Sequence, residues 1–482
     1  MSKREYIGRI IVTLSLLMVT ACTVGPDYIR PTPVAVMPAT FRELAGWKEA
    51  HPRDGVPGEK WWEIYRDPLL NTLEEQVTVS NLTVAAAEAQ FRQARAAGQG
   101  AKAGYFPTVS VGASASRSQR SGNLGAVPGA GATTSDFLLP LDLTWEIDLW
   151  GKIRRSVEAG GAQAQASAAD LAAVTLSSQA ELAGDYFLLR TLDAQKRLLD
   201  DTAEVYRKSL ELTNNRYAAG VAARSDILLA ESQLKSAMAQ ALDTGVQRAG
   251  LEHAIGLLTG KAAADFSLPA MPLPLVTSPP SIPVGLPSEL LERRPDIAGG
   301  ERRMAAANAQ IGVATAAWYP TVKLSASAGL EASGISRWLN WPSRLWAVGP
   351  GVSETLFDGG ARRAQNEQLR AAYDGTVANY RQTVLSGFKE VEDNLAALRI
   401  LAEEARVQNE AVIAAEQSVT IISNQYKAGT VGYLNVIVLQ ASELSSERAA
   451  MDILGRRMTA SVLLVKALGG GWVLREPRPE GR

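Results

Sequence analysis

The side chains that most often carry out catalysis or bind metals are scarce in this chain of 482 residues. It contains one cysteine, Cys22, and two histidines, His51 and His253, which lie far apart in the sequence. Zinc sites need several such ligands close together, and a Ser-His-Asp triad needs a placed histidine. The HExxH, GxGxxG, P-loop and GxSxG motifs are also missing from the sequence. We therefore expect neither an enzyme nor a cofactor-binding protein.

The single cysteine lies where lipid chemistry is possible. Residues 1–21 have the basic start and apolar run of a signal peptide, and Cys22 follows Ala21 at its end. This order resembles a bacterial lipoprotein box, in which cleavage before the cysteine is followed by acylation of its thiol. Two or more acyl chains give stable anchoring. Thr23 stands where inner-membrane lipoproteins typically carry aspartate, which favours the outer membrane. Ordinary secretory cleavage near Ala21 is the alternative.

Charge and hydropathy exclude two further classes. The formal net charge is −1, so no basic surface for nucleic acid is expected. After the signal peptide, no apolar run approaches the ~20 residues of a membrane-spanning helix.

An amphipathic strand is predicted at Phe137–Asp148, where apolar residues alternate with largely polar ones. Such a strand fits a half-buried sheet, or a membrane strand between lipid and a water-filled lumen. The pattern recurs, and we predict three more strands, at residues 108–116, 321–330 and 346–357. The last is the weakest, because Pro350 interrupts it and Glu354 falls on its apolar side. A bulge or an early end is expected there.

The strands belong to a longer unit that occurs twice. Tyr105-Phe106-Pro107 returns as Trp318-Tyr319-Pro320, and the Tyr-x-Ala-Gly turn at residues 217–220 returns at 426–429. The unit reads helix, strand, strand, long helix, turn, helix. Alanine-rich seams at spacings of three and four indicate close helix packing. Helices are predicted at about 68–104, 148–216, 226–259, 289–317 and 434–468, with a second long helix that contains residues 369–398.

Four membrane strands cannot close a barrel, because about eight is the minimum. An open sheet edge in lipid would leave backbone groups unpaired, which costs several kcal/mol for each. Other copies must therefore complete the barrel, and three copies would give twelve strands around a lumen. The expected fold is mostly α with a small membrane β-part. It is a trimeric duct, in which a 12-stranded β-barrel stands on a long helical α-barrel built from two internal repeats.

The predicted division of the chain has six parts. They are a signal peptide (1–21), a lipidated extended tether (22–60), a first repeat (61–260), a Pro-rich equatorial linker (261–288), a second repeat (289–468) and a C-terminal tail (469–482).

Several short motifs occur in order along the chain. They are Cys22–Tyr28, Trp61-Trp62, Asp67–Leu70, Tyr105–Pro107, Asp148–Lys152, Arg293–Asp296, Phe357–Gly360 and the two Tyr-x-Ala-Gly turns. Together they resemble the bacterial outer membrane factor family, the TolC-like and OprM-like efflux lipoproteins. The resemblance implies a homotrimer in the outer membrane that is lipid-anchored and extends into the periplasm. A periplasmic adaptor and an inner-membrane transporter would be its partners, and outer-membrane lipid would surround it.

The resemblance also implies a function, which is passive conduction of small toxic compounds from the periplasm to the outside. Family members narrow the periplasmic tip just after the second-half turn, and the matching positions here are Leu434, Asn435 and Val438. Relatives often carry aspartate at the last two positions, so we expect an apolar constriction that closes by occlusion and dewetting. Asp226 matches Asn435 in the first half, where it either joins the gate or only starts a helix.

The two glycine turns would contact the adaptor in this family. The residues concerned are Arg216, Tyr217, Gly220, Gln425, Tyr426 and Gly429. Glycine capping of the helix ends is expected in either case. The alternative interpretation is a periplasmic coiled-coil adaptor lipoprotein of an export system, which accounts for the helices and Cys22 but not for four alternating strands. The sequence leaves the cargo open among drugs, dyes, lipids and metal ions.

Overall fold

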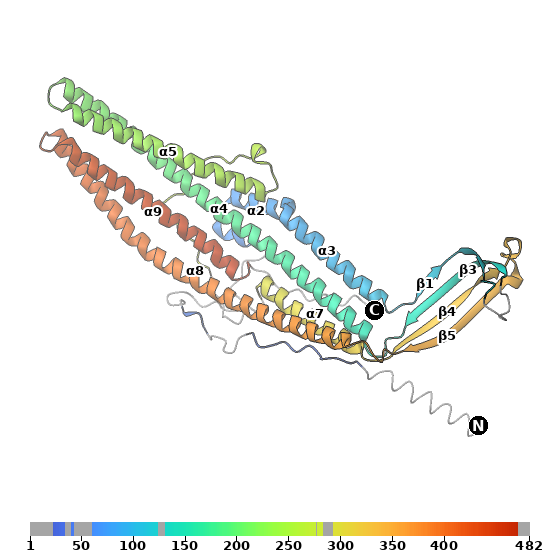
Figure 1. Ribbon diagram of the computed structural model, residues 1–482. Helices are drawn as coiled ribbons and strands as arrows, with labels where there is room; N and C mark the ends of the chain where they lie inside the picture. Colours follow the sequence, from blue (N-terminus) through green and yellow to red (C-terminus); the bar gives the residue numbers. More distant parts are fainter. Residues whose placement is uncertain are drawn as a thin grey trace. The chain divides into compact units, whose positions relative to one another are not determined.

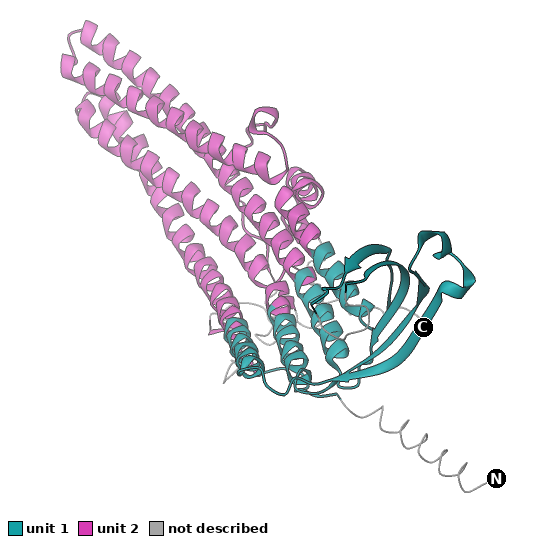
Figure 2. Ribbon diagram, turned by 45° about the vertical axis from the view of Figure 1, so that its right-hand side comes forward, with its two compact units in different colours: residues 1–31, 91–167, 300–380 teal, residues 32–90, 168–299, 381–482 magenta. Residues whose placement is uncertain are grey.

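The computed structural model describes residues 23–33, 40–42, 60–123, 131–275, 277–282 and 293–470. The predicted signal peptide, Cys22, most of the tether and nearly all of the C-terminal tail lie outside the described residues. The chain divides into two compact units, which Figure 2 shows in different colours. Unit one comprises residues 1–31, 91–167 and 300–380, and unit two comprises 32–90, 168–299 and 381–482. Each unit takes segments from both predicted repeats.

Unit one contains an antiparallel sheet (Figure 1). Its strands are β1 (Thr108–Val111), β2 (Ser114–Gln119), β3 (Thr133–Glu146), β4 (Thr321–Ala332) and β5 (Arg344–Ser353). The order is β1-β3-β4-β5, and β2 also pairs with β3. β1 and β2 keep one register along β3, from Thr108 opposite Thr144 to Gln119 opposite Thr133. β1 and β2 therefore lie end to end opposite β3 as one interrupted strand, which we call the β1–β2 line. All four predicted strands are thus present.

Pro140 explains why the β1–β2 line is interrupted between its two strands. Gly112, between β1 and β2, donates its backbone N–H to the Pro140 carbonyl at 3.0 Å. In an antiparallel pair, a residue directs its N–H and its C=O toward the same neighbour. Proline has no N–H to return. The ladder loses a hydrogen bond at this point without an extra residue, so the gap is not a bulge.

The fourth strand ends earlier than predicted. It covers Arg344–Ser353 instead of 346–357, and Pro350 stays in register opposite Leu324 without a bulge. Arg362 accounts for the early end, because it holds the residues after the strand against the start of the next helix. Its guanidinium lies 3.6 Å from the Glu354 carboxylate and donates to the Thr355 carbonyl at 2.5 Å.

The helices repeat in length as well as in order. They are α2 (Pro68–Ser80), α3 (Leu82–Ala103), α4 (Lys152–Ala218), α5 (Arg224–Leu258), α7 (Pro295–Ala316), α8 (Ala361–Lys427) and α9 (Tyr433–Ala467). Short 3-10 turns lie at Trp61–Tyr65, Ala263–Asp265, Ile335–Arg337 and Trp341–Ser343. α4 and α8 each have 67 residues, and α5 and α9 each have 35. Both views show α4 beside α5 and α8 beside α9, so the duplication yields two helical hairpins (Figures 1 and 2).

The helix predicted at residues 68–104 is in fact two helices. Asn81 has an extended backbone, with φ −69° and ψ 122°, and its side-chain oxygen accepts from the Thr83 and Val84 N–H groups. These bonds make Asn81 the N-cap of α3. Its amide also donates to the Leu258 carbonyl at 2.8 Å. Helical periodicity did not reveal this break, because a capping asparagine also fits a polar position within a helix.

The core of unit two is built where the segment of Trp61 to Ser80 packs on α4. The Trp61 indole donates to Gln179 at 3.4 Å, and the Tyr186 hydroxyl donates to Asp67 at 2.5 Å. Glu74 lies on the same buried face of α2 as Leu70 and is itself fully buried. Burial raises the pKa of Glu74 to about 9, so its carboxyl is neutral at pH 7.

Among the helices described, none has an apolar stretch long enough to cross a membrane. In the part of the chain that the structure describes, no group of three or more His, Cys, Asp or Glu side chains is placed to hold a metal ion.

Candidate functional site

The sheet of unit one has one apolar face, which the register assembles from strands distant in sequence. Leu141 lies opposite Val111 on one side and Ala328 on the other, and Ala328 lies opposite Trp346. Directly opposed residues share a face, so this row is apolar across the sheet. The next row crosses Ser110, Asp142, Ser327 and Ala347 and is largely polar.

Within the described residues, nothing covers this apolar face. No residue of the five described strands is buried. The side chains of Val111, Trp346 and Val352 are 73%, 76% and 69% exposed. An apolar patch of this extent marks contact with lipid or with another protein.

The segment that follows Cys22 is docked within unit one. Gly25 has φ 103°, and a Cβ atom there would come within 2.5 Å of the Gly312 Cα, so only glycine fits. Further contacts are Val24 N–H to the Trp150 carbonyl (3.2 Å), Asn308 to the Pro26 carbonyl (3.0 Å), Arg155 to Asp27 (2.7 Å) and the Tyr28 hydroxyl to Glu301 (3.5 Å). Thr23 lies against Gly151, at the connection from β3 to α4. These contacts fix the chain directly after Cys22.

In unit two, the hairpins α4–α5 and α8–α9 end in matching turns. Gly220 has φ 75° and Gly429 has φ 79°. Val221 N–H donates to the Arg216 carbonyl at 2.8 Å, and Thr430 N–H donates to the Gln425 carbonyl at 3.0 Å. Both helices therefore end in left-handed glycine caps.

A cross-link joins the ends of the two hairpins. The Arg216 guanidinium donates to the Tyr426 carbonyl at 2.7 Å and lies 4.5 Å from the centre of the Tyr426 ring. About two helical turns along α4, the Ser209 and Tyr433 hydroxyls are 3.1 Å apart. Tyr426 and Tyr433 pack at 5.3 Å between ring centres and bury Val436. We call this group, Ser209, Arg216, Tyr426 and Tyr433, the hairpin latch.

The residues predicted to form a gate begin α9, beside the latch. Leu434 and Val438 are each 58% exposed and stand one helical turn apart, so they share a face. Asn435 is also exposed. Asp226 lies at the start of α5, where its carboxylate accepts the Ala223 N–H at 3.3 Å. This is the helix-starting geometry, and a part for Asp226 in the gate stays a prediction.

The six residues predicted to meet an adaptor divide into two groups. Tyr217, Gly220, Gln425 and Gly429 are exposed. Tyr426 is only 5% exposed, and Arg216 is half-buried against it. Sequence reasoning missed the latch, because Tyr426 ends α8 and Tyr433 begins α9, so no periodicity within one helix pairs them.

Comparison with known proteins identifies the family to which this architecture belongs. The family description "Outer membrane efflux protein" matches residues 73–261 and 286–470. The solvent efflux pump outer membrane protein SrpC of Pseudomonas putida is 30% identical over 460 residues, which cover 95% of this chain and 97% of SrpC. The outer membrane protein OprJ of Pseudomonas aeruginosa is 30% identical over 473 residues, covering 95% of each chain.

Solved structures agree with the sequence relatives. The outer-membrane channel OprN is similar with a TM-score of 0.87 and 31% identity, over 94% of this chain and 100% of that one. The outer membrane protein VceC of Vibrio cholerae is similar with a TM-score of 0.79 and 28% identity, over 86% of this chain and 99% of that one. The periplasmic adaptor alternative finds no support in these relatives, which are outer-membrane proteins. The chain therefore belongs to the outer membrane efflux protein family, lies in the outer membrane and is the outer-membrane component of an efflux pump.

Proposed function

We propose that three copies of this chain close into one duct, through which small toxic compounds leave the periplasm passively. The observation that carries this proposal is the sheet. Within the described residues, β5 pairs with β4 alone, and the β1–β2 line pairs with β3 alone. Unpaired edges are excluded from lipid, and the apolar face is uncovered. Pairing of β5 with the β1–β2 line of the next copy gives the backbone groups of both edges hydrogen-bond partners.

The docked segment Thr23–Arg30 supports a lipid anchor at Cys22, which itself lies outside the described residues. Thr23 lies against Gly151 beside the base of β3. An acyl group on the preceding residue would therefore enter the membrane next to the strands. The anchor would hold the chain in the leaflet that its sheet already contacts.

The hairpin ends supply the gate in this proposal. Leu434 and Val438 would line the constriction, and the latch would hold the α8–α9 hairpin against the α4–α5 hairpin. A periplasmic adaptor that contacts the exposed turn residues, such as Tyr217 and Gln425, would open it. An inner-membrane transporter would supply the energy, because the chain shows no nucleotide-binding motif.

The cargo proposed here follows the names of the relatives, which include solvent, toluene and antibiotic efflux proteins. The test is deletion of the gene, followed by growth on toluene, on antibiotics and on metal salts. Sensitivity to the organic compounds should rise and should return to normal with the natural chain. Unchanged sensitivity to every organic compound, with new sensitivity to metals alone, would contradict the proposed cargo.

A further inference from the structure

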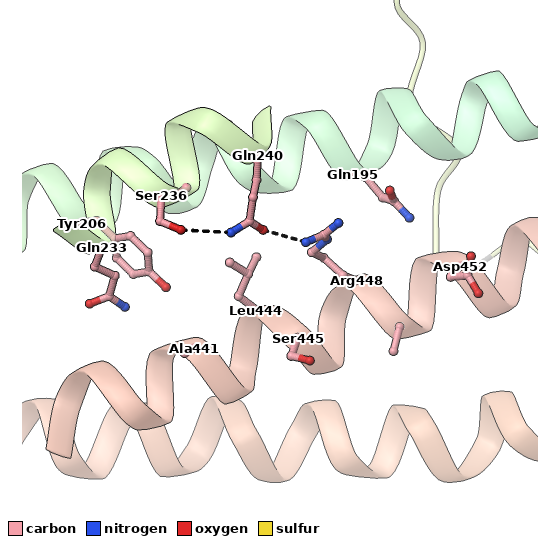
Figure 3. Close-up of a pocket in the computed structure, with 12 residues that line it drawn as sticks. Gln195, Tyr206, Gln233, Ser236, Gln240, Ala441, Leu444, Ser445, Arg448 and Asp452 are labelled. Carbon is pink, nitrogen blue, oxygen red and sulfur yellow. Dashed lines mark hydrogen bonds between the residues drawn. The ribbon is translucent and has the colours of Figure 1, made fainter. Parts of the chain in front are cut away.

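A groove lies between the two hairpins of unit two, and on α9 its lining begins at Ala441, about one helical turn after Val438. It is lined from three helices, α4, α5 and α9, and has a cavity volume of about 570 Å³. Figure 3 shows Tyr206, Gln233, Ser236 and Gln240 on one wall and Leu444 and Arg448 on the other. Sites for small organic molecules typically have volumes of roughly 300 to 1,000 Å³. The groove has room for one such molecule.

A short chain of hydrogen bonds crosses the groove. Arg448 Nη1 of α9 donates to Gln240 Oε1 of α5 at 2.7 Å, and the Gln240 amide nitrogen donates to the Ser236 hydroxyl at 3.3 Å (Figure 3). Among the described residues, this is the only hydrogen bond that the Arg448 guanidinium makes. Its Nε and Nη2 donors stay available to a ligand.

Among the described residues, no carboxylate lies within ion-pair distance of the Arg448 guanidinium. The acidic residue of the lining is Asp452, one turn further along α9. Asp452 is engaged with Arg456 at 3.9 Å. Glu443 and Glu447 of α9 lie within electrostatic range of the Tyr206 hydroxyl. Arg448 is the cation among the lining residues, so an anionic group is favoured at its end of the groove.

The inner wall offers polar groups and an apolar surface together. The oxygen and nitrogen of the Gln233 amide are shielded from solvent and have no well-formed hydrogen bond with the described residues. The amide lies close to the Tyr206 hydroxyl. Tyr206 and Leu444 are buried and supply the apolar wall.

We propose that this groove binds a small organic anion, with its carboxylate or sulfonate on Arg448 and its apolar body against Tyr206 and Leu444. The ligand contacts α5 and α9 at once, so it ties the two hairpins together. A consequence that rests on the proposed function is that the bound anion favours the closed duct. Binding itself does not depend on conduction.

The test uses the purified full-length protein in lipid nanodiscs, titrated calorimetrically with 2-naphthalenesulfonate. Its neutral analogue, 2-naphthalenemethanol, is titrated in parallel. We expect saturable binding of one sulfonate per chain. Arg448→Gln should weaken it at least tenfold, because a charge-assisted contact is lost, and should leave the weaker binding of the neutral analogue unchanged.

Two further variants keep the test decisive. Lys235→Gln removes an exposed cation of α5 outside the lining and should change the affinity less than twofold. Ser445→Phe fills the groove while keeping Arg448 and should abolish binding, so it decides the question if the Arg448 variant does not fold. Absence of saturable sulfonate binding to the natural protein would overturn the site. Equal affinity in the natural protein, the Arg448 variant and the Ser445 variant would overturn it as well.

Discussion

The two hairpin turns have the same backbone conformation, but their tyrosines lie in opposite environments. Tyr217 and Tyr426 occupy equivalent positions of the repeat, three residues before the capping glycine. Tyr217 is 46% exposed, whereas Tyr426 is 5% exposed and packs on Tyr433. Arg216 reaches across to Tyr426, while its own equivalent, Gln425, is exposed.

This difference shows that both halves of the repeat keep the glycine cap, whereas the two turns have different structural roles. The glycines keep both turns, because only they adopt the left-handed backbone at low cost. The second-half turn provides the internal anchor, and the first-half turn supplies the arginine that holds it. Of the two tyrosines, Tyr217 is the one available to a partner.

The largest effect is expected at Tyr426. Tyr426→Ala removes a buried ring and should destabilise the hairpin ends by about 3 kcal/mol, as other buried aromatic truncations do. Tyr217→Ala should cost less than about 0.5 kcal/mol, because its ring is exposed. Hydrogen–deuterium exchange over residues 210–230 for Tyr217→Ala, and over residues 420–440 for Tyr426→Ala, measures the two effects.

Tyr426→Phe is the control for the first prediction. The Tyr426 and Thr213 hydroxyls are 3.5 Å apart, a weak contact, so this variant should exchange almost as the natural protein does. Similar protection in Tyr217→Ala and Tyr426→Ala would show that the two turns are not different after all.

A smaller effect is expected at Arg216. Arg216→Gln loses a charge-assisted hydrogen bond and a cation–π contact, together worth about 1–2 kcal/mol. The α8–α9 hairpin should then exchange faster, while Gln425→Arg should leave exchange unchanged, since Gln425 faces solvent. Faster exchange in α4–α5 alone would mean that Arg216 does not hold the second hairpin.

The helices, the strands and the turns could be predicted from the sequence because each has a periodic or glycine signal. The break at Asn81 could not, since a capping asparagine also fits a polar position within a helix, and the contact of its amide with Leu258 is made far along the chain. The latch was missed for the same reason. Arg216 and Tyr426 are conspicuous only once two hairpins 210 residues apart are placed side by side. In the segment Thr23–Arg30, the sequence revealed only a motif. The docking of this segment could not be predicted, because its contacts are made with residues remote in sequence.

The smallest effect concerns pH and again separates the hairpins. Burial, with Glu443 and Glu416 nearby, raises the pKa of Glu447 in α9 to about 7, whereas the equivalent position of α5 is Met238. A carboxyl whose pKa is raised by folding favours the fold only while protonated. Stability of the α8–α9 hairpin should therefore fall as pH rises from about 4.5 to above 7.

Glu447→Gln removes this dependence. Exchange in α9, corrected for the intrinsic pH effect, should increase between pH 5 and pH 8 in the natural protein and change less in the variant. α5 should show little change in either protein. An identical pH response of α9 in both would assign the dependence to other groups.

We propose that residues of the second half close the duct, and planar-bilayer recording tests this most directly. The purified lipidated protein should form channels of low conductance. Leu434→Ser with Val438→Ser should raise the conductance several-fold, because polar side chains wet a narrow apolar constriction. Leu229→Ser, at the first-half position equivalent to Val438, should leave it unchanged. Channels that the double variant does not widen, or a protein that forms no channels at all, would contradict the account.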